Sequence, residues 1–434
     1  MDKTVKLHFF NNKLYLFFSL IFILVLFPGY GKSRITDFHA FENFFTGKEN
    51  IDNQAVCEYV KKMPLQQKIC QMLLVSLDSN SLTSTVNNTY EPGGYLFFAF
   101  NFNSDISESR KLSFALKQSA SEKNQIIPFI STDFEGGIVN RLNNIAFHFP
   151  SEKYIAENFS LQHAFLFYYF QNMQLKCLGV DVNLAPVVEA VNSDNKEFLG
   201  SRSFGDYEKT VKYSYAAINA MKKAGVYPVL KHFPGNSKTD PHKNLPEISF
   251  TSSDVRNQYL KPFDLLLNDS DEGLLVAHTI LSDISDLPSC LSETVIEEYI
   301  RKKKFNGLLF SDDLLMDALL KNGFPLEKSL VMAVRAGIDV IMISKSSYQD
   351  VCDILFNASA TDNYLAGRID ESVTKILKWK IEQGLLKLTY YNDNGIVRAM
   401  LVNNSDFRSI YFDESDFYSN YKNAEIVYNS VMVK

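Results

Sequence analysis

The sequence predicts a single α/β catalytic domain with the (β/α)₈ barrel fold, and three observations support this. Short apolar runs bounded by Gly, Pro or Asp recur about eight times along the chain. Most of them are apolar nearly throughout rather than alternating, as expected for strands buried on both faces of a parallel sheet. Helical patterns lie between most of the runs, and such repeated alternation is typical of this barrel. An open doubly wound sheet is the alternative, but no Gly-x-Gly-x-x-Gly follows any of the runs.

The elements follow in chain order from these patterns. Strands are expected at residues 71–75, 95–99, 127–132, 181–185, 227–231, 273–277, 307–311 and 339–343. The clearest helical patterns cover residues 108–123, 207–224, 253–267 and 292–303, with a last helix over 370–383. We expect the barrel domain to span residues 32–390. Residues 391–434 form a Tyr- and Asn-rich tail with apolar patches at 395–402 and 426–433, and the sequence assigns no role to it.

Composition and charge exclude several function classes. The chain has 434 residues, 22% of them charged, and a formal net charge of −6, which argues against a nucleic-acid partner. The one dense basic run, Arg301-Lys-Lys-Lys304, is typical of the solvated end of a helix. No His/Cys cluster has metal-ligand spacing and no phosphate-binding loop occurs, so we expect neither a metal nor another cofactor. The five cysteines are widely spaced and odd in number, which allows at most one or two disulfides.

The N-terminus has the pattern of an export signal. Lys3, Lys6 and Lys13 precede residues 14–27, which are apolar apart from Tyr15 and Ser19, and Pro28-Gly-Tyr-Gly31 follows. A basic start, an apolar core of this length and small residues after it predict a secretory signal over residues 1–31. The apolar run is short for a membrane-spanning helix, yet an uncleaved anchor, with membrane attachment through residues 14–27, remains the alternative. We therefore expect an exported protein, periplasmic or extracellular.

The predicted barrel also indicates where chemistry would lie. Barrel active sites form at the carboxyl ends of the strands. In this chain those ends carry Asp133, His232, His278 and Asp312. Reactive residue types at several strand ends are harder to explain by turn chemistry than a single example would be.

Residues 231–246 place two histidines and an aspartate, His232, Asp240 and His242, in one short loop. An Asp beside a His orients the imidazole and shifts its pKa toward values useful for proton transfer. The same stretch is rich in Pro, Gly, Asn, Ser and Asp, which are the usual turn residues. From these residues alone, a catalytic site and an ordinary turn both stay open.

Two further strand ends have similar alternatives. Asp312 and Asp313 are adjacent carboxylates after a strand, where a helix N-cap is the simpler interpretation. Opposite an Asp-His pair, one of them would instead suit a nucleophile, since retaining sugar hydrolysis needs a carboxylate below the anomeric carbon. Asp133 and Arg141 flank a Gly-Gly turn and would face the barrel mouth, unless the segment is an ordinary loop. Arg202 lies in another loop and would otherwise be a surface ion-pair residue.

Together these segments resemble glycoside hydrolase family 3, in its single-domain β-N-acetylglucosaminidase (β-N-acetylhexosaminidase) branch. The resemblance runs from about Pro64 to Leu386, and the order and spacing of the motifs make it specific. The matching segments are residues 64–72, 93–98, 133–137, 180–186, 202–204, 231–235, 311–313 and 368–372.

The resemblance implies a retaining exo-β-N-acetylglucosaminidase that releases terminal GlcNAc from peptidoglycan fragments or chitooligosaccharides. It implies that Asp312 is the nucleophile and that His242 is the general acid/base, with Asp240 as its dyad partner. The residues implied to bind the hydroxyls of the non-reducing sugar, by charge-assisted hydrogen bonds, are Asp133, Arg141, Arg202, Lys231 and His232. His278 also matches a family histidine, without a firm role.

This chain departs from the family pattern at the dyad loop. The stretch between Gly235 and Asp240 is shorter than usual, and Pro241, where Ser is usual, restricts the conformation of Asp240. Ile138 replaces a usual Arg, and Glu189 stands where Asp is common. A carbohydrate-binding protein that has lost catalysis is therefore one alternative. A β-glucosidase of the same family is another, although those enzymes usually draw their acid/base from a second domain.

Overall fold

The computed structural model describes residues 52–78, 89–241, 243–345, 348–393 and 396–432, with backbone only between 392 and 398. The expected signal or anchor at residues 1–31 and the expected acid/base His242 lie outside the described residues. Within the described residues, no helix combines the length and the apolar character needed to cross a bilayer.

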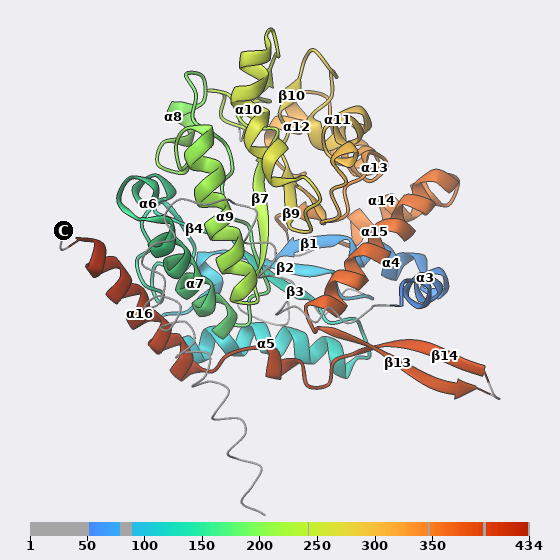
Figure 1. Ribbon diagram of the computed structural model, residues 1–434. Helices are drawn as coiled ribbons and strands as arrows, with labels where there is room; N and C mark the ends of the chain where they lie inside the picture. The colour runs from blue at the N-terminus through green and yellow to red at the C-terminus, as the bar shows by residue number, and fades with distance from the viewer. Residues whose placement is uncertain (1–51, 79–88, 242, 346–347, 394–395, 433–434) are drawn as a thin grey trace, which may run out of the picture. The chain divides into compact units, whose positions relative to one another are not determined.

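In the described part of the chain, eight parallel strands form the barrel (Figure 1). Each strand pairs with the next along the chain, β1 pairs with β12, and a parallel bridge between Phe310 and Val340 joins β11 to β12. The predicted (β/α)₈ fold is confirmed, and every observed barrel strand overlaps one of the predicted segments. The strands are β1 (Leu73–Ser76), β2 (Gly94–Phe97), β3 (Phe129–Thr132), β6 (Val182–Asn183), β7 (Tyr227–Phe233), β9 (Gly273–Val276), β11 (Leu309–Ser311) and β12 (Ile341–Ile343).

Helices surround this barrel, and side-chain caps set many of their first residues. The longer ones are α5 (Ile106–Glu122), α7 (Leu161–Cys177), α9 (Tyr207–Lys223), α10 (Ser253–Leu266), α13 (Leu326–Ala336), α14 (Gln349–Ser359) and α15 (Asn363–Glu382). The shorter ones are α3 (Asn53–Lys62), α4 (Leu65–Gln71), α6 (Glu152–Asn158), α8 (Lys196–Leu199), α11 (Glu293–Tyr299) and α12 (Asp317–Lys321). Asp105, Asp206 and Ser252 accept backbone N–H groups at the starts of α5, α9 and α10, close to the predicted boundaries.

Two predicted helices have different limits. The helix expected over residues 292–303 ends as α11 at Tyr299, and a 3₁₀ turn, Arg301–Lys303, follows. The last barrel helix begins earlier than residue 370, at Asn363, because the Asp362 side chain accepts the N–H of Leu365. In both cases a cap or a tightened last turn sets the limit, which an apolar pattern does not reveal.

The segment after the last barrel helix packs onto the barrel. Strands β13 (Leu386–Asp393) and β14 (Ile396–Asn403) form an antiparallel hairpin, and α16 (Glu414–Met432) runs along α7 (Figure 1). Between them, buried Tyr411 donates a 2.5 Å hydrogen bond to Asp181, which also forms a 2.7 Å ion pair with Lys117 of α5. Because Asp181 immediately precedes β6, this contact lies at the amino ends of the strands, away from the predicted site.

Candidate active site

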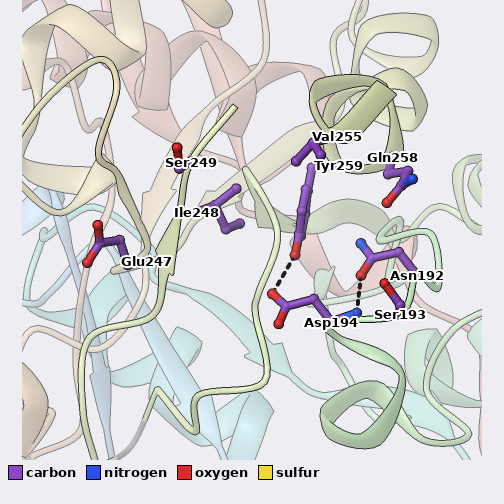
Figure 2. A pocket seen from close by; sticks show the side chains of 9 residues that line it. All are labelled: Asn192, Ser193, Asp194, Glu247, Ile248, Ser249, Val255, Gln258 and Tyr259. Atoms are coloured by element: carbon purple, nitrogen blue, oxygen red, sulfur yellow. Dashed lines mark hydrogen bonds between the residues drawn. The ribbon is translucent and has the colours of Figure 1, made fainter. Parts of the chain in front are cut away.

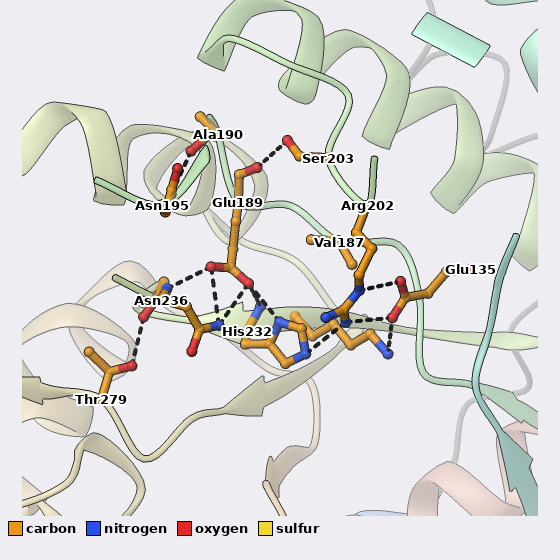
Figure 3. A network of polar contacts seen from close by, with 12 residues as sticks. Glu135, Val187, Glu189, Ala190, Asn195, Arg202, Ser203, His232, Asn236 and Thr279 are labelled. Carbon is orange, nitrogen blue, oxygen red and sulfur yellow. Dashed lines mark hydrogen bonds and ion pairs between the residues drawn. The ribbon is translucent and has the colours of Figure 1, made fainter. Parts of the chain in front are cut away.

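Buried charges gather where β3 and β7 end (Figure 3). Glu135 lies in β4 (Phe134–Gly136), directly after β3, with 1% of its surface exposed. Arg202 donates from Nε and Nη2 to the two carboxylate oxygens of Glu135 at 2.9 and 2.8 Å. Lys231 Nζ lies 2.7 Å from Oε1 of Glu135. Burial would raise the pKa of Glu135, but Lys231 and Arg202 outweigh it and hold that pKa at about 2. Glu135 is therefore ionised at neutral pH.

The predicted sugar-binding residues join this network. Lys231 Nζ donates to Asp133 at 2.7 Å, and Arg141 Nη2 lies 3.6 Å from the other oxygen of Asp133. Burial would lower the pKa of Lys231, but Asp133 and Glu135 raise it, so the ammonium stays charged. Arg202 Nη2 also lies 3.5 Å from Nε2 of His232. A continuous chain of contacts thus brings all five predicted sugar-binding residues together at the barrel rim.

Glu189, in the loop after β6, fixes the imidazole of His232. The carboxylate of Glu189 is buried and lies 2.6 Å from His232 Nδ1, and it accepts the N–H of Asn236 at 2.6 Å. A carboxylate facing Nδ1 favours a proton on that nitrogen, and Arg202, which only donates, favours a lone pair on Nε2. The ring is therefore held with Nε2 toward Arg202 (Figure 3).

Asp312 lies directly after β11, two strands from β7 around the barrel. Its N–H donates to the carbonyl of Val276, and its own carboxylate accepts the N–H of Asp313 at 2.8 Å. The neighbouring Asp313 accepts the N–H groups of Leu315 and Ser344, and burial raises its pKa. Asp313 thus secures the turn through two backbone N–H groups, and both adjacent residues remain partly exposed.

Neither carboxylate caps the following helix. Among the described residues, α12 begins after Met316 with no side-chain cap. The simpler alternative for Asp312, a helix cap, therefore does not describe this turn.

His278, which follows β9, contacts the turn that contains Asp312 and Asp313. It is fully buried, with Nε2 3.0 Å from the carbonyl oxygen of Asp313 and Nδ1 3.2 Å from the sulfur of Cys290. Because a carbonyl only accepts, Nε2 carries the proton and Nδ1 accepts from the thiol. Burial, and then the nearby Asp312, raise the pKa of Cys290 and keep that thiol protonated.

The expected acid/base dyad is described only in part. Asp240 lies in the loop after β7 with 39% of its side chain exposed, and Lys243 Nζ lies 3.3 Å from its carboxylate. Its carbonyl accepts the N–H groups of Lys243 and Asn244, which forms a turn. His242 lies outside the described residues, so the geometry of a dyad stays a prediction.

A cavity of about 210 Å³ is lined by residues other than those of the charged network (Figure 2). The loop after β6, the short strand β8 (Glu247–Ile248) and α10 line it, and Tyr259 of α10 donates to Asp194 at 2.8 Å across it. None of the described site residues lines this cavity. Within the described residues, no three His, Cys, Asp or Glu side chains gather as metal ligands would.

Glu135 and Glu189 belong to this network, and the sequence analysis did not select either of them as a site residue. Glu135 stands two residues after Asp133, and in an extended segment such positions share a face, so this spacing is a usable signal. Glu189 follows β6 by several residues, and its contact with His232 depends on the path of two separate loops. Only the tertiary structure brings these two carboxylates to the network.

Comparison with known proteins identifies the family of this chain. Residues 64–379 match the family model described as the glycosyl hydrolase family 3 N terminal domain. The chain is 26% identical to the β-hexosaminidase LpqI of Mycobacterium tuberculosis over 329 residues, covering 73% of this chain and 82% of LpqI. It is 30% identical to a β-hexosaminidase of Idiomarina loihiensis over 249 residues, covering 56% of this chain and 74% of that protein.

Two solved structures are also similar to this chain. A family 3 β-N-acetylglucosaminidase from Paenibacillus sp. FPU-7 superposes with a TM-score of 0.68 at 26% identity, covering 80% of this chain and 68% of that one. The structure of LpqI from M. tuberculosis shares the fold with a TM-score of 0.66 at 24% identity, covering 74% of this chain and 95% of LpqI. The chain therefore belongs to glycosyl hydrolase family 3, as a glycoside hydrolase that groups with the β-hexosaminidases.

Proposed function

We propose that this protein is a retaining exo-β-N-acetylglucosaminidase. It would release terminal GlcNAc from peptidoglycan fragments or chitooligosaccharides. The observation that carries this proposal is the charged network of Asp133, Arg141, Arg202, Lys231 and His232 at the strand ends, with Asp312 on the same rim. The names of the relatives, β-hexosaminidase and β-N-acetylglucosaminidase, support GlcNAc as the sugar.

The proposed mechanism is a double displacement. Asp312 attacks the anomeric carbon and forms a glycosyl-enzyme, while His242 protonates the leaving oxygen and Asp240 orients the imidazole. Water activated by the neutral His242 then releases the sugar, and such acid/base help is typically worth about 10²–10⁴ in rate. The charged network would hold the hydroxyls of the terminal sugar, so that Asp312 meets the anomeric carbon in one orientation.

Two chromogenic substrates test the proposal directly. The full chain, and a form lacking residues 1–31, should release 4-nitrophenol from the β-GlcNAc derivative and not from the β-glucoside. Asp312→Asn should abolish this release while the variant still binds GlcNAc. Release from the glucoside instead would favour a family 3 β-glucosidase and contradict the proposed specificity.

A second candidate function is carbohydrate binding without turnover. It is favoured by the dyad loop, where Asp240 is half-exposed, pairs with Lys243 and precedes Pro241. Calorimetry with GlcNAc distinguishes the two candidates. Binding by a folded protein that releases no 4-nitrophenol would establish the binding protein.

We further propose that the protein is exported, with residues 1–31 acting as a cleaved signal or as an anchor. The basic start and apolar core of this segment support export. Cell fractionation followed by intact mass measurement tests it. A cytoplasmic protein that retains residues 1–31 would contradict it.

A further inference from the structure

The first turn of α6 contacts three segments that carry the charged network. The N–H of Lys153 donates to the carbonyl of Ser201, next to Arg202, at 3.2 Å. On another side, a Cβ placed on Gly137 would lie only 2.7 Å from the Cβ of Ser151, so this turn packs tightly against the segment of Glu135. The third contact comes from the side chain of Glu152, whose Oε1 accepts the N–H of Val187 at 2.8 Å.

The contact with Val187 controls the placement of two sugar-binding groups. Val187 forms a parallel bridge with Lys231, and the N–H of Val188 donates to the carbonyl of Lys231 at 2.8 Å. Two residues after Val187, Glu189 holds the imidazole of His232. Residues 186–189 therefore position the backbone of Lys231 and the imidazole ring of His232. The hydrogen bond from Val187 to Glu152 holds this segment in place.

The surroundings of Glu152 favour a neutral carboxylic acid. Only 2% of Glu152 is exposed, and its Oε2 has no hydrogen-bond partner among the described residues. The charged groups that face it are Glu135, Arg202 and Lys231, and the phenol of Tyr168 also lies near. Burial, and then repulsion by Glu135, raise the pKa of Glu152 well above its ordinary value. With Glu152 neutral, Arg202 and Lys231 pair with Glu135, whereas an ionised Glu152 carboxylate would compete with Glu135 for these two cations.

We propose that Glu152, as a neutral carboxylic acid, is a positioning residue that aligns Lys231 and His232 for the sugar through the N–H of Val187. The inference rests on the proposed function, because its main measurements use the β-GlcNAc substrate. Among the described residues, the hydrogen bond of the Glu152 carboxyl group comes from the N–H of Val187, so Glu152 acts through the segment that it holds.

Two variants of Glu152 separate this role from general stability. Glu152→Gln keeps an uncharged acceptor for the Val187 N–H and should leave KM and the Ki of GlcNAc within about twofold of wild type, whereas Glu152→Ala leaves that N–H unpaired and should raise both by roughly tenfold. Tyr411→Phe is the matched control, since it removes a buried hydrogen bond at the opposite end of the barrel. It should lower the unfolding midpoint without changing KM, because partial unfolding reduces the amount of active enzyme and not its affinity.

Hydrogen exchange provides a readout that does not need activity. The amide of Val187 should exchange faster in Glu152→Ala than in wild type and Glu152→Gln. In Glu152→Ala, an unchanged exchange rate of the Val187 amide together with an unchanged KM would overturn the inference. A raised KM in Glu152→Gln would overturn the proposal that the carboxylic acid of Glu152 is neutral. A wild type that hydrolyses no β-GlcNAc substrate would instead refute the proposed function, with the exchange result still deciding whether Glu152 holds the segment.

Discussion

Replacing Glu135 with glutamine removes one negative charge from between two buried cations and keeps the shape of the side chain. Arg202 and Lys231 would then share a buried pocket without the carboxylate that both contact within 3 Å. Breaking a buried ion pair by removing one partner typically costs about 3–5 kcal/mol of unfolding free energy. The pKa of Glu135 gives a similar value, since a fall from 4.5 to about 2 corresponds to about 3 kcal/mol.

The pH dependence of this contribution follows from the depressed pKa. The contribution is fully present above the unfolded pKa of about 4.5 and is lost as the pH falls toward the folded pKa of about 2. About 2 kcal/mol of it should already be lost near pH 3. Urea unfolding of wild type and Glu135→Gln at neutral pH and at successively lower pH values measures this difference.

Glu208→Gln provides the control for this experiment. Glu208 is exposed and lies 3.6 Å from Lys212 on the surface of α9, so its replacement should change stability by less than about 1 kcal/mol. A difference between wild type and Glu135→Gln below about 1 kcal/mol, or one that does not shrink between pH 5 and 3, would refute the argument from buried charge.

Three further predictions concern catalysis, a buried amine and a thiol pair. His242→Ala should lose about 10²–10⁴ of the turnover of chitobiose and far less with 4-nitrophenyl β-GlcNAc, and equal losses would contradict the acid role. Burial lowers the pKa of Lys380 to about 7. Between about pH 7 and 10.5 the Lys380 amine is therefore protonated in the unfolded chain but not in the folded one, so the stability of the wild type should rise with pH in this range. Urea unfolding should show a smaller rise in Lys380→Met, and an unchanged rise would contradict the assignment. The buried sulfurs of Cys70 and Cys352 lie 3.2 Å apart, so refolding with oxidised glutathione should link them. Peptide mapping without reduction detects this link, with Cys352→Ser as control, and only unlinked peptides in the wild type would contradict it.

The barrel could be predicted from sequence because its strands are buried on both faces. Continuous apolar runs such as the one ending at Val75 must be covered by helices on one side and by other strands' side chains on the other. The same patterns predicted each strand end to within two residues of the observed one, and so placed Asp133, His232 and Asp312 near one rim, although His232 lies inside β7 rather than after it. Helix limits were less predictable because they depend on single hydrogen bonds, such as that from the N–H of Leu365 to Asp362.

The tail illustrates a different limit. Residues 391–434 have apolar patches but no pattern that names their partner. In the structure α16 packs along α7, and Tyr411 reaches Asp181 beside Lys117. These contacts join residues more than two hundred positions apart, and local composition carries no information about such pairs.

The sequence by itself determined the barrel, the strand ends and the residue types available for sugar chemistry, because these depend on local apolar patterns and on short motifs. The tertiary structure alone decided the electrostatics of the site. Glu135 receives Arg202 from a distant loop and Lys231 from β7, Glu189 in the loop after β6 contacts His232, and burial raises the pKa of Glu152. The charge state of a carboxyl group depends on its burial and on the charges that folding brings within a few ångströms. The local sequence specifies neither of these.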